Sequence, residues 1–202
     1  MKRLFLAVLF AILSCSSNID TTKIQEGDII FQTSRSAQSK AIQSATHSKY
    51  SHMGIILKNG TEYYVLEAVQ PVRYTLLKEW IKKGEKSHYV VKRLKDSEKV
   101  LTEENLKKMK KIGEGFKGKN YDLYFDWSDN KIYCSELVWK IYQRATGIEI
   151  GQLQKLKDFD LNNQLVKKKL KERYGDNIPL TELVISPANI FDSDKLKAVI
   201  EN

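Results

Sequence analysis

Apolar and polar positions along the chain recur with two spacings, one typical of strands and the other of helices. Stretches dense in β-branched and aromatic residues predict buried strands at residues 27–32, which open with a Gly-Asp turn, and at residues 51–57, 61–69 and 89–94. Only Lys58-Asn59-Gly60 separates the second stretch from the third. This spacing predicts a β-hairpin.

Helical spacing of apolar residues, with capping residues in front, predicts several helices between and after these strands. The first is expected to run from Ser34 or Ser36 to Thr46, and the second to begin at Thr102, with Gly113, Gly115 and Gly118 loosening and ending it. A third is expected from Cys134 to a stop at Gly147. Two more are expected over residues 163–174 and from Ser186-Pro187 onward. Strands and helices are intermixed without regular βαβ alternation. The pattern therefore predicts an α+β fold with an antiparallel sheet.

The first residues have the layout of a bacterial export signal. Lys2-Arg3 precedes ten apolar residues from Leu4 to Leu13. That run is too short to span a bilayer as a helix, which takes about 20 residues. Ile12-Leu13-Ser14-Cys15 resembles a lipobox, in which the cysteine is lipidated and becomes the mature N-terminus. The alternative is an ordinary secretory signal with an incidental cysteine.

This interpretation divides the chain into a signal peptide at residues 1–14, a lipidated tether at 15–22 and a single domain at 23–202. It predicts a protein of the bacterial cell envelope that is anchored to a membrane through Cys15. Cys134 then has no disulfide partner in an oxidising compartment, so it is a candidate reactive thiol. A buried, inert cysteine is the alternative.

Composition narrows the classes of function. The chain has 202 residues, with 34 Lys and Arg against 25 Asp and Glu, a net charge of +9, two Cys and three His. This mix excludes collagen and multi-span membrane proteins, and two cysteines exclude disulfide scaffolds and Cys-rich zinc ribbons. The charge would favour nucleic acid in the cytoplasm, but export removes that partner. The Lys167-Lys168-Lys169 run predicts a solvated helix face, with contact to anionic lipid or polymer as the alternative.

The predicted hairpin places His52 relative to a carboxylate. Asn-Gly favours a two-residue type I′ turn, and a turn at Asn59-Gly60 would set His52 directly opposite Glu67. Directly opposed side chains share one face of the sheet, with Cβ atoms about 4.5–5.5 Å apart. A carboxylate there can hold one imidazole nitrogen and raise the basicity of the ring. An ordinary polar cross-strand pair is the alternative.

Cys134 begins a predicted helix whose apolar stripe includes Leu137 and Val138, so it is expected to face the interior. The unpaired backbone N–H groups and the dipole at that end of the helix favour a thiolate. Cysteine, histidine and a carboxylate can act as a nucleophile, its base and the group that orients the base. The spacing alone does not place Cys134 beside His52.

The remaining candidates carry less weight. His47 and His88 have no carboxylate placed by the predicted register and are expected to be surface or structural residues. A zinc site of His47, His52 and Cys134 lacks the closely paired ligands that such sites need. Neither a metal nor another cofactor is therefore expected. Trp80 is expected to lie in the core or on a helix face.

Four separated motifs are shared with one enzyme family. They are Gly27-Asp28-Ile29-Ile30-Phe31-Gln32, Tyr50-Ser51-His52-Met53-Gly54, Val65-Leu66-Glu67-Ala68 and Tyr133-Cys134-Ser135-Glu136-Leu137-Val138-Trp139. The chain resembles the NlpC-type cell-wall peptidases of the papain-like cysteine fold, and among them the circularly permuted branch of YiiX-like lipoproteins, in which histidine precedes cysteine. The likeness continues through residues 177–180 and 186–187, so it covers nearly the whole chain after the signal.

The resemblance implies a permuted papain-like fold, with an antiparallel sheet packed against helices and the nucleophile at a helix N-terminus. It implies Cys134 as the nucleophile, His52 as the base and Glu67 as the third polar residue. In this family a tyrosine upstream of the cysteine helps to bind the oxyanion, and Tyr121 matches it. The cell-wall enzymes usually have Asp-Cys-Ser-Gly where this chain has Tyr133-Cys134-Ser135-Glu136. A bulky Tyr133 and a charged Glu136 therefore flank the nucleophile, which argues against the usual cell-wall substrate.

The leading hypothesis is a cysteine hydrolase that cleaves an amide bond, and the resemblance points to a cell-wall peptide as its substrate. One alternative is a lipid-directed acyl hydrolase or acyltransferase of the same fold. Such relatives tend to use a second histidine as the third polar group, so Glu67 favours the amidase. The other alternative is a non-catalytic envelope-binding protein, which the intact cysteine, histidine and glutamate argue against.

Overall fold

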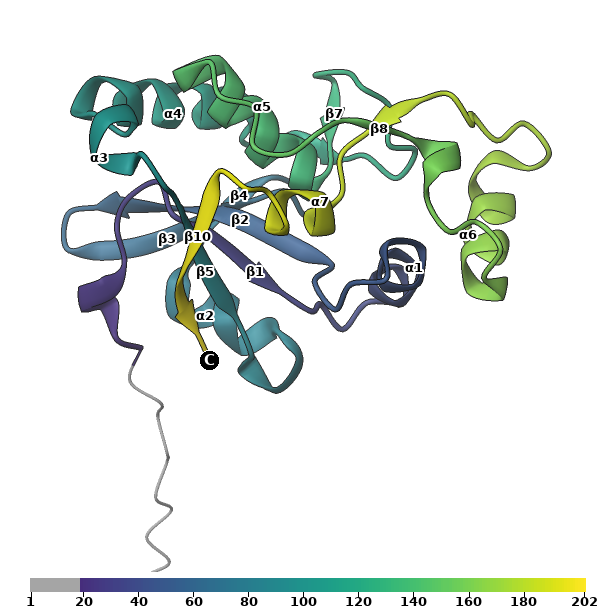
Figure 1. Cartoon of the computed structure of the whole chain (residues 1–202), viewed down its shortest axis with the longest axis horizontal. Coiled ribbons are helices and arrows are strands. Elements are labelled where there is room, and N and C mark those ends of the chain that lie inside the picture. The colour runs from purple at the N-terminus through teal and green to yellow at the C-terminus, as the bar shows by residue number, and fades with distance from the viewer. Residues whose placement is uncertain (1–18) are drawn as a thin grey trace, which may run out of the picture.

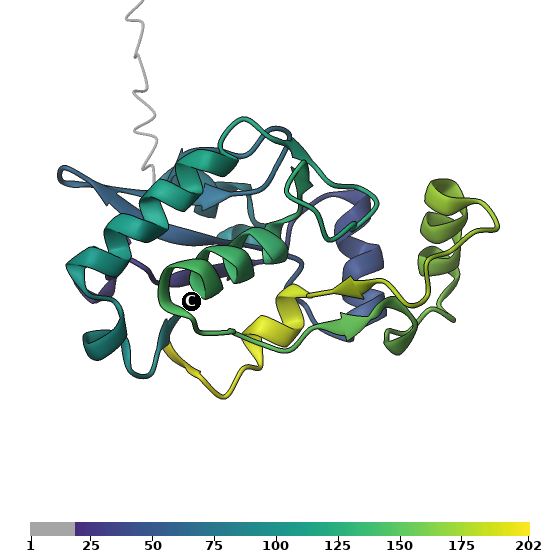
Figure 2. The ribbon, with the colours of Figure 1, turned by 90° about the horizontal axis from the view of Figure 1, so that it is seen from above.

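The computed structural model describes residues 19–202. The predicted signal peptide and the predicted lipidation site Cys15 lie outside the described residues. Six antiparallel strands form the central sheet in the order β10-β5-β1-β2-β3-β4. Helices α4 and α5 lie side by side over one face of this sheet, and α2 covers the other face (Figures 1 and 2).

The bounds of the elements agree with most of the predicted stretches. The strands of the sheet are β1 (Ile29–Gln32), β2 (His52–Asn59), β3 (Glu62–Glu67), β4 (Arg73–Leu76), β5 (Val90–Leu94) and β10 (Leu196–Glu201). The helices are α1 (Ala37–Thr46), α2 (Leu77–Lys83), α3 (Ser97–Val100), α4 (Glu103–Phe116), α5 (Cys134–Thr146), α6 (Gln164–Tyr174) and α7 (Pro187–Phe191). Two short ladders join β6 (Asn120–Tyr121) to β7 (Lys131–Ile132) and β8 (Gln154–Lys155) to β9 (Leu183–Val184).

The predicted caps lie at the starts of their helices. The Ser36 side chain accepts a hydrogen bond from the backbone of α1, Thr102 caps α4, Asn163 caps α6 and Ser186 caps α7. Gly147 ends α5 in the left-handed conformation that glycine adopts without steric cost. Helix α4 continues through Gly113 and Gly115, so the prediction that these glycines loosen it was wrong. It ends at Phe116, two residues before Gly118, whose φ is positive, as the predicted end near Gly118 requires.

The hairpin turn is displaced by one residue from its predicted position. Asn59 pairs with Glu62 in the ladder, so the turn is Gly60-Thr61 and not Asn59-Gly60. Of the two turn residues only Gly60 has a positive φ, as a type II′ turn requires at its first central residue. Every partner therefore moves two residues along β3, and the predicted direct pairing of His52 with Glu67 was wrong. A two-residue shift keeps each side chain on its face of the sheet, because the side-chain period is two.

A hydrophobic core lies on each face of the sheet. The larger one, between the sheet and helices α4 and α5, includes Met53, Leu137 and Tyr142. The smaller one, between the sheet and α2, includes Val65 and Trp80. Within residues 19–202, no helix combines the length and the apolar character that crossing a membrane requires.

Gly54 of β2 packs closely against β3. A Cβ built at Gly54 would lie 2.6 Å from the backbone oxygen of Leu66 and 2.4 Å from a methyl group of Val65. The backbone oxygen belongs to the ladder and cannot move aside without breaking it. The strand that carries His52 therefore requires glycine at this position.

We predict that Gly54→Ala lowers the free energy of unfolding by about 1–3 kcal/mol, the usual cost of overpacking a core. Urea titration followed by circular dichroism measures this difference. Gly115→Ala is the matched control, because a Cβ there meets nothing within 4 Å and alanine favours the α4 helix. Equal stability of the two variants would contradict the close approach.

Candidate active site

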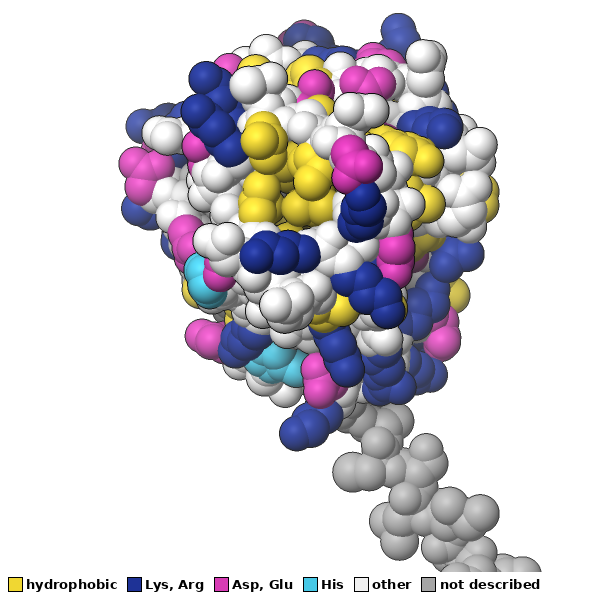
Figure 3. Space-filling model, turned by 90° about the vertical axis from the view of Figure 1, so that its right-hand side faces the viewer, with side chains coloured by type: hydrophobic (Ala, Val, Ile, Leu, Met, Phe, Trp, Pro, Cys, Tyr) yellow, Lys and Arg dark blue, Asp and Glu magenta, His cyan; other side chains and the backbone are white. Residues whose placement is uncertain are grey.

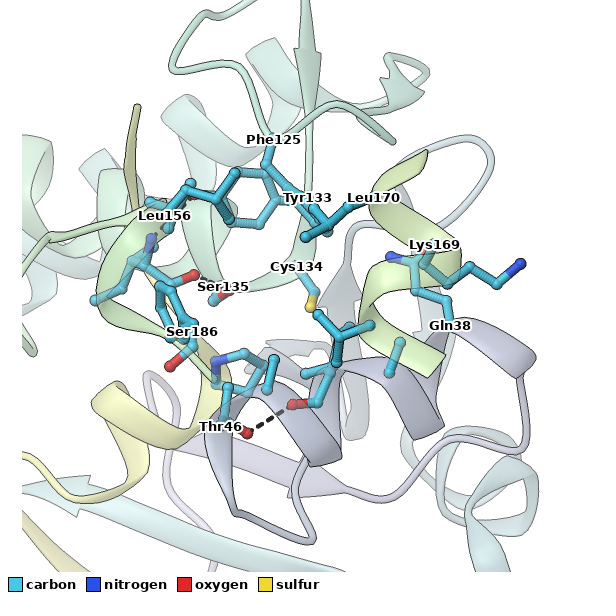
Figure 4. A pocket seen from close by; sticks show the side chains of 18 of the residues that line it. Gln38, Thr46, Phe125, Tyr133, Cys134, Ser135, Leu156, Lys169, Leu170 and Ser186 are labelled. Carbon is cyan, nitrogen blue, oxygen red and sulfur yellow. Dashed lines mark hydrogen bonds between the residues drawn. The ribbon is translucent and has the colours of Figure 1, made fainter. Parts of the chain in front are cut away.

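Cys134 begins α5, the helix that crosses β2 in the core. Its side chain is buried, with 2% of the residue exposed, and the thiol forms no disulfide. The backbone N–H of Tyr133 donates to the Glu136 carboxylate, which closes the first turn of the helix. Figure 4 shows the sulfur directed into a hollow between α5 and α1. The thiol thus lies at the end of α5 whose first N–H groups have no partner within the helix.

His52 begins β2 and is held from two sides. Its Nε2 lies 2.7 Å from Oε2 of Glu67 on β3. Its ring stacks on the indole of Trp80 from α2, with the centroids 5.7 Å apart and the planes at 24°. Both side chains are buried, since His52 is 9% and Trp80 0% exposed. The orientation of the imidazole is therefore fixed by the sheet on one side and by α2 on the other.

The thiol of Cys134 interacts with this ring. Burial lowers the pKa of His52, but hydrogen bonding to Cys134 and Glu67 and the charges of both groups outweigh burial and raise the pKa to about 10. Glu67 occupies Nε2. Nδ1 is therefore the ring nitrogen that is available to the thiol. The cysteine and the histidine, which lie far apart in the sequence, are brought together here by the packing of α5 on β2.

The Glu67 carboxylate is surrounded by hydrogen-bonding and positively charged side chains. Burial raises the pKa of its carboxyl group, but the hydrogen bond and charge of His52, the hydroxyl of Thr75 and the charge of Lys83 together lower it to about 2. Thr75 Oγ1 donates to Oε1 at 2.7 Å. Arg73 and Lys83 lie 3.7 and 3.8 Å from the same oxygen. The carboxylate is thus ionised at any physiological pH and keeps its charge next to the imidazole.

We predict that Glu67→Gln lowers the free energy of unfolding by about 1–3 kcal/mol, the range for loss of a buried hydrogen bond to a charged group. The loss should be largest between pH 4.5 and 6.5. Below this window the contribution of Glu67 is lost as the pH falls from 4.5, its unfolded pKa, to about 2, its folded pKa. Above the window the contribution of His52 is lost as the pH rises from 6.5, its unfolded pKa, to about 10, its folded pKa. In both directions the wild-type protein loses the charge pair and approaches the variant.

Urea titrations of both proteins across this pH range measure the effect. Glu103→Gln, at an exposed carboxylate paired with Lys107, serves as the control and should show no such window. A Glu67→Gln difference that is independent of pH would contradict the assigned charge pair.

Tyr121 lies at the edge of the same hollow, on β6. Its hydroxyl accepts a hydrogen bond from Gln38 Nε2 on α1 at 3.0 Å. Gln38 Oε1 in turn accepts from Arg173 on α6, also at 3.0 Å. Burial and the charge of Cys134 raise the pKa of Tyr121 well above its usual range. The hydroxyl therefore stays protonated and can donate a hydrogen bond to an anion next to Cys134. Its role as oxyanion donor stays a prediction.

The residues that flank the nucleophile have structural partners. Glu136 is fully buried and pairs with Lys140 at 2.6 Å. The hydroxyl of Tyr133 accepts a hydrogen bond from the backbone N–H of Ile185 at 3.1 Å, and its ring borders the hollow in Figure 4. Of the two departures from the cell-wall enzymes, Tyr133 thus shapes the cleft. Glu136 points into the fold and does not bear on the substrate.

Two hollows lie at the site, one lined by Cys134 and the other by His52. The first, here called the apolar hollow, spans about 730 Å³ including space open to solvent. Its apolar lining comes mainly from α1, α6 and the segments beside α5, and includes Ile42, Phe125, Tyr133, Leu156, Val166 and Leu170. The second, here called the polar hollow, spans about 1250 Å³ including space open to solvent, and is lined among others by Gln32, Ser34, Ser36, Ser51, His52 and Glu67. Figure 3 shows apolar side chains in a depression bordered by Lys and Arg, on the side of the molecule that carries α1 and α6.

Comparison with known proteins explains this arrangement. Residues 23–200 match the family described as permuted papain-like amidases, the YaeF/YiiX or C92 peptidase family. The chain belongs to this family. It is 53% identical to the protein YiiX of Escherichia coli K12 over 175 residues, which cover 87% of this chain and 85% of YiiX. It superposes with a TM-score of 0.85 on the crystal structure of the metalloprotein YiiX from Escherichia coli O157:H7, at 53% identity, covering 89% of this chain and 98% of that one.

Membership of the YaeF/YiiX family confirms the predicted permuted papain-like fold and the class of the protein, a cysteine amidase. The solved relative is described as a metalloprotein. Residues 19–202 of this chain contain no group of three or more His, Cys, Asp or Glu side chains placed to hold a metal ion. The residues present thus do not fit a metal centre, and the chemistry below involves none. His47 lies on the surface, 3.4 Å from Asp160, and His88 contacts the carbonyl of Asn202.

Two side chains at the site were not predicted from the sequence as functional. Trp80 was expected only in the core or on a helix face, and it is also the ring on which His52 stacks. Gln38 was not singled out at all, although it lines both hollows and holds Tyr121. A lone glutamine on an amphipathic helix has no sequence signal that separates it from a surface residue.

Proposed function

We propose that this protein is an envelope lipoprotein that hydrolyses an amide bond through Cys134, His52 and Glu67. The observation that carries the proposal is the position of one buried imidazole between a free thiol and an ionised carboxylate. This is the arrangement of a nucleophile, its base and the group that orients the base.

In the proposed reaction, His52 takes the proton of the Cys134 thiol, and the sulfur attacks the carbonyl carbon of the amide. The oxyanion that forms accepts hydrogen bonds from the backbone N–H of Cys134 and from the Tyr121 hydroxyl. His52 gives its proton to the leaving nitrogen, the C–N bond breaks, and the acyl group stays on sulfur as a thioester. Water then attacks the thioester while His52 accepts its proton, which returns to the thiol as the acid is released.

The place of action follows from the N-terminal sequence. The lipobox-like Ile12-Leu13-Ser14-Cys15 supports export, lipidation at Cys15 and anchoring in the bacterial envelope. Cell-wall peptides are amide polymers within reach of such an anchor, and the NlpC-type relatives cleave them. A peptide of this kind is therefore the first substrate of the proposal.

The apolar hollow supports a second candidate. An acyl group attached to Cys134 extends into a cavity lined by aromatic and aliphatic side chains, among them Phe125, Tyr133 and Leu170. Such a lining fits a hydrocarbon chain better than the polar stem of a cell-wall peptide, because burial of polar groups without partners is unfavourable. This observation favours an amide or ester of a fatty acid as the substrate, cleaved by the same three residues.

We expect the purified protein to cleave one of two substrate classes, soluble muropeptides or amides and esters of decanoic acid, in a reaction that depends on Cys134. Product analysis by liquid chromatography, with Cys134→Ala as the control, measures both classes side by side. Cleavage of muropeptides alone supports the cell-wall amidase, and cleavage of decanoyl compounds alone supports the second candidate. If neither class is cleaved and Cys134 does not react with iodoacetamide, the protein is a binding protein and the proposal is wrong.

A further inference from the structure

The two hollows contain different members of the catalytic set. Cys134 lines the apolar hollow, and His52 and Glu67 line the polar hollow. Gln38, Ile42 and Tyr121 line both, so the two spaces join at these three residues. A substrate that reacts with Cys134 and takes a proton from His52 must therefore reach into both spaces.

The direction of the substrate follows from the chemistry of the two residues. The acyl group becomes attached to the sulfur, so it occupies the side of Cys134. The leaving nitrogen must accept a proton from the imidazole, which requires a distance of about 2.6–3.2 Å. The leaving group therefore occupies the side of His52, which is the polar hollow.

The polar hollow has an excess of positive charge. Arg35, Arg73 and Lys83 line it, and among its described lining residues the only acidic one is Glu67. The single carboxylate of Glu67 is shared by His52, Arg73 and Lys83. The hollow therefore has more cations than carboxylates, and Arg35 forms no ion pair with a described residue of its lining.

The donors of these cations remain largely available. Arg35 uses one guanidinium nitrogen for the carbonyl of Gly84 at 3.0 Å, which holds the side chain at the rim. Arg73 and Lys83 lie 3.7 and 3.8 Å from Glu67, beyond the length of a hydrogen bond, and about half of each side chain is exposed. Serine hydroxyls of Ser34 and Ser36 lie in the same hollow and add further donors.

We propose that the leaving group of the substrate carries an anion, a carboxylate or a phosphate, which Arg35 binds together with Arg73 and Lys83. The substrate class is then an amide with an apolar acyl part and an anionic amine part. Guanidinium and ammonium groups bind such anions through charge-assisted hydrogen bonds. This inference rests on the proposed assignment of Cys134 as nucleophile and His52 as proton donor.

A matched pair of compounds tests the inference. N-decanoyl-para-aminobenzoate and N-decanoyl-para-aminobenzamide have the same acyl chain and shape and differ only in the charge of the leaving amine. Binding of each to the Cys134→Ala protein by isothermal titration calorimetry requires no turnover. Hydrolysis of each by the wild-type protein is measured in parallel. The same titrations with para-aminobenzoate and with inorganic phosphate show which anion is preferred.

We expect the carboxylate compound to bind about tenfold more tightly than the amide compound, as charge-assisted hydrogen bonds allow. Added to the Cys134→Ala protein, Arg35→Gln should remove most of this preference, and Arg35→Lys, which keeps the charge, should retain part of it. Lys40→Gln removes an exposed charge of α1 outside both hollows and should leave the preference unchanged.

The outcomes separate this inference from the proposed function. Equal binding of the two compounds, or tighter binding of the neutral one, overturns the anionic leaving group even if both are hydrolysed through Cys134. A preference that Lys40→Gln reduces as much as Arg35→Gln also overturns it, because the effect would then be one of net charge. An Arg35-dependent preference without any Cys134-dependent hydrolysis supports the anion site and contradicts the amidase.

Discussion

Cys134→Ala is expected to abolish turnover while the protein stays folded. Loss of the nucleophile in a hydrolase of this type lowers kcat by about 10⁵–10⁶-fold, because no other group can form the acyl intermediate. The side chain is small and buried, so its loss should cost about 1 kcal/mol of stability at most. Initial rates with the cleaved substrate, together with urea titration, measure both quantities.

Cys134→Ser gives a matched test of the same group. Serine keeps the size of the side chain and its position at the start of α5 but is a far weaker nucleophile in the absence of strong base activation. It should be nearly as inactive as alanine. Activity within tenfold of the wild type in either variant would exclude Cys134 as the nucleophile.

His52→Gln is expected to lower turnover by about 10²–10⁴-fold, the usual contribution of a general base. Glutamine can keep a hydrogen bond to Glu67 but cannot take the thiol proton or return it to the leaving nitrogen. The variant should also slow alkylation of Cys134 by iodoacetamide at neutral pH, because the imidazolium no longer stabilises the thiolate. Steady-state rates and alkylation rates between pH 5 and 9 measure the two effects.

His47→Gln is the control for this variant. His47 lies on the surface beside Asp160 and lines neither hollow. Its replacement should leave both rates unchanged. If His52→Gln alkylates as fast as the wild type, the thiol does not depend on this ring and the assigned pair is wrong.

The pairing of His52 with Glu67 could be predicted from the sequence even though the register could not. The Asn-Gly signal predicted the turn one residue too early, so the observed ladder differs from the predicted one by two residues. An even shift preserves which face each side chain occupies. The two side chains are diagonal neighbours on one face, and long polar side chains reach across that distance.

The meeting of Cys134 with His52 could not be derived from local pattern. It depends on how α5 packs on β2, a contact between segments that lie far apart in the chain. Only the family resemblance predicted it. Strands β4 and β10 and helix α2 were not predicted from the sequence. The start of α2 has no capping side chain to mark it. The stacking of Trp80 on His52 was missed with α2.

Detection of an acyl group on Cys134 during turnover tests its role as the nucleophile most directly. Protein quenched in acid while it hydrolyses a substrate is analysed by intact-mass spectrometry and peptide mapping. We expect a mass gain equal to that of the acyl group, located on the peptide that contains Cys134, removed by hydroxylamine and absent from Cys134→Ala. Full turnover without an adduct on Cys134, together with turnover that persists in Cys134→Ala, would contradict the role of Cys134 as the nucleophile.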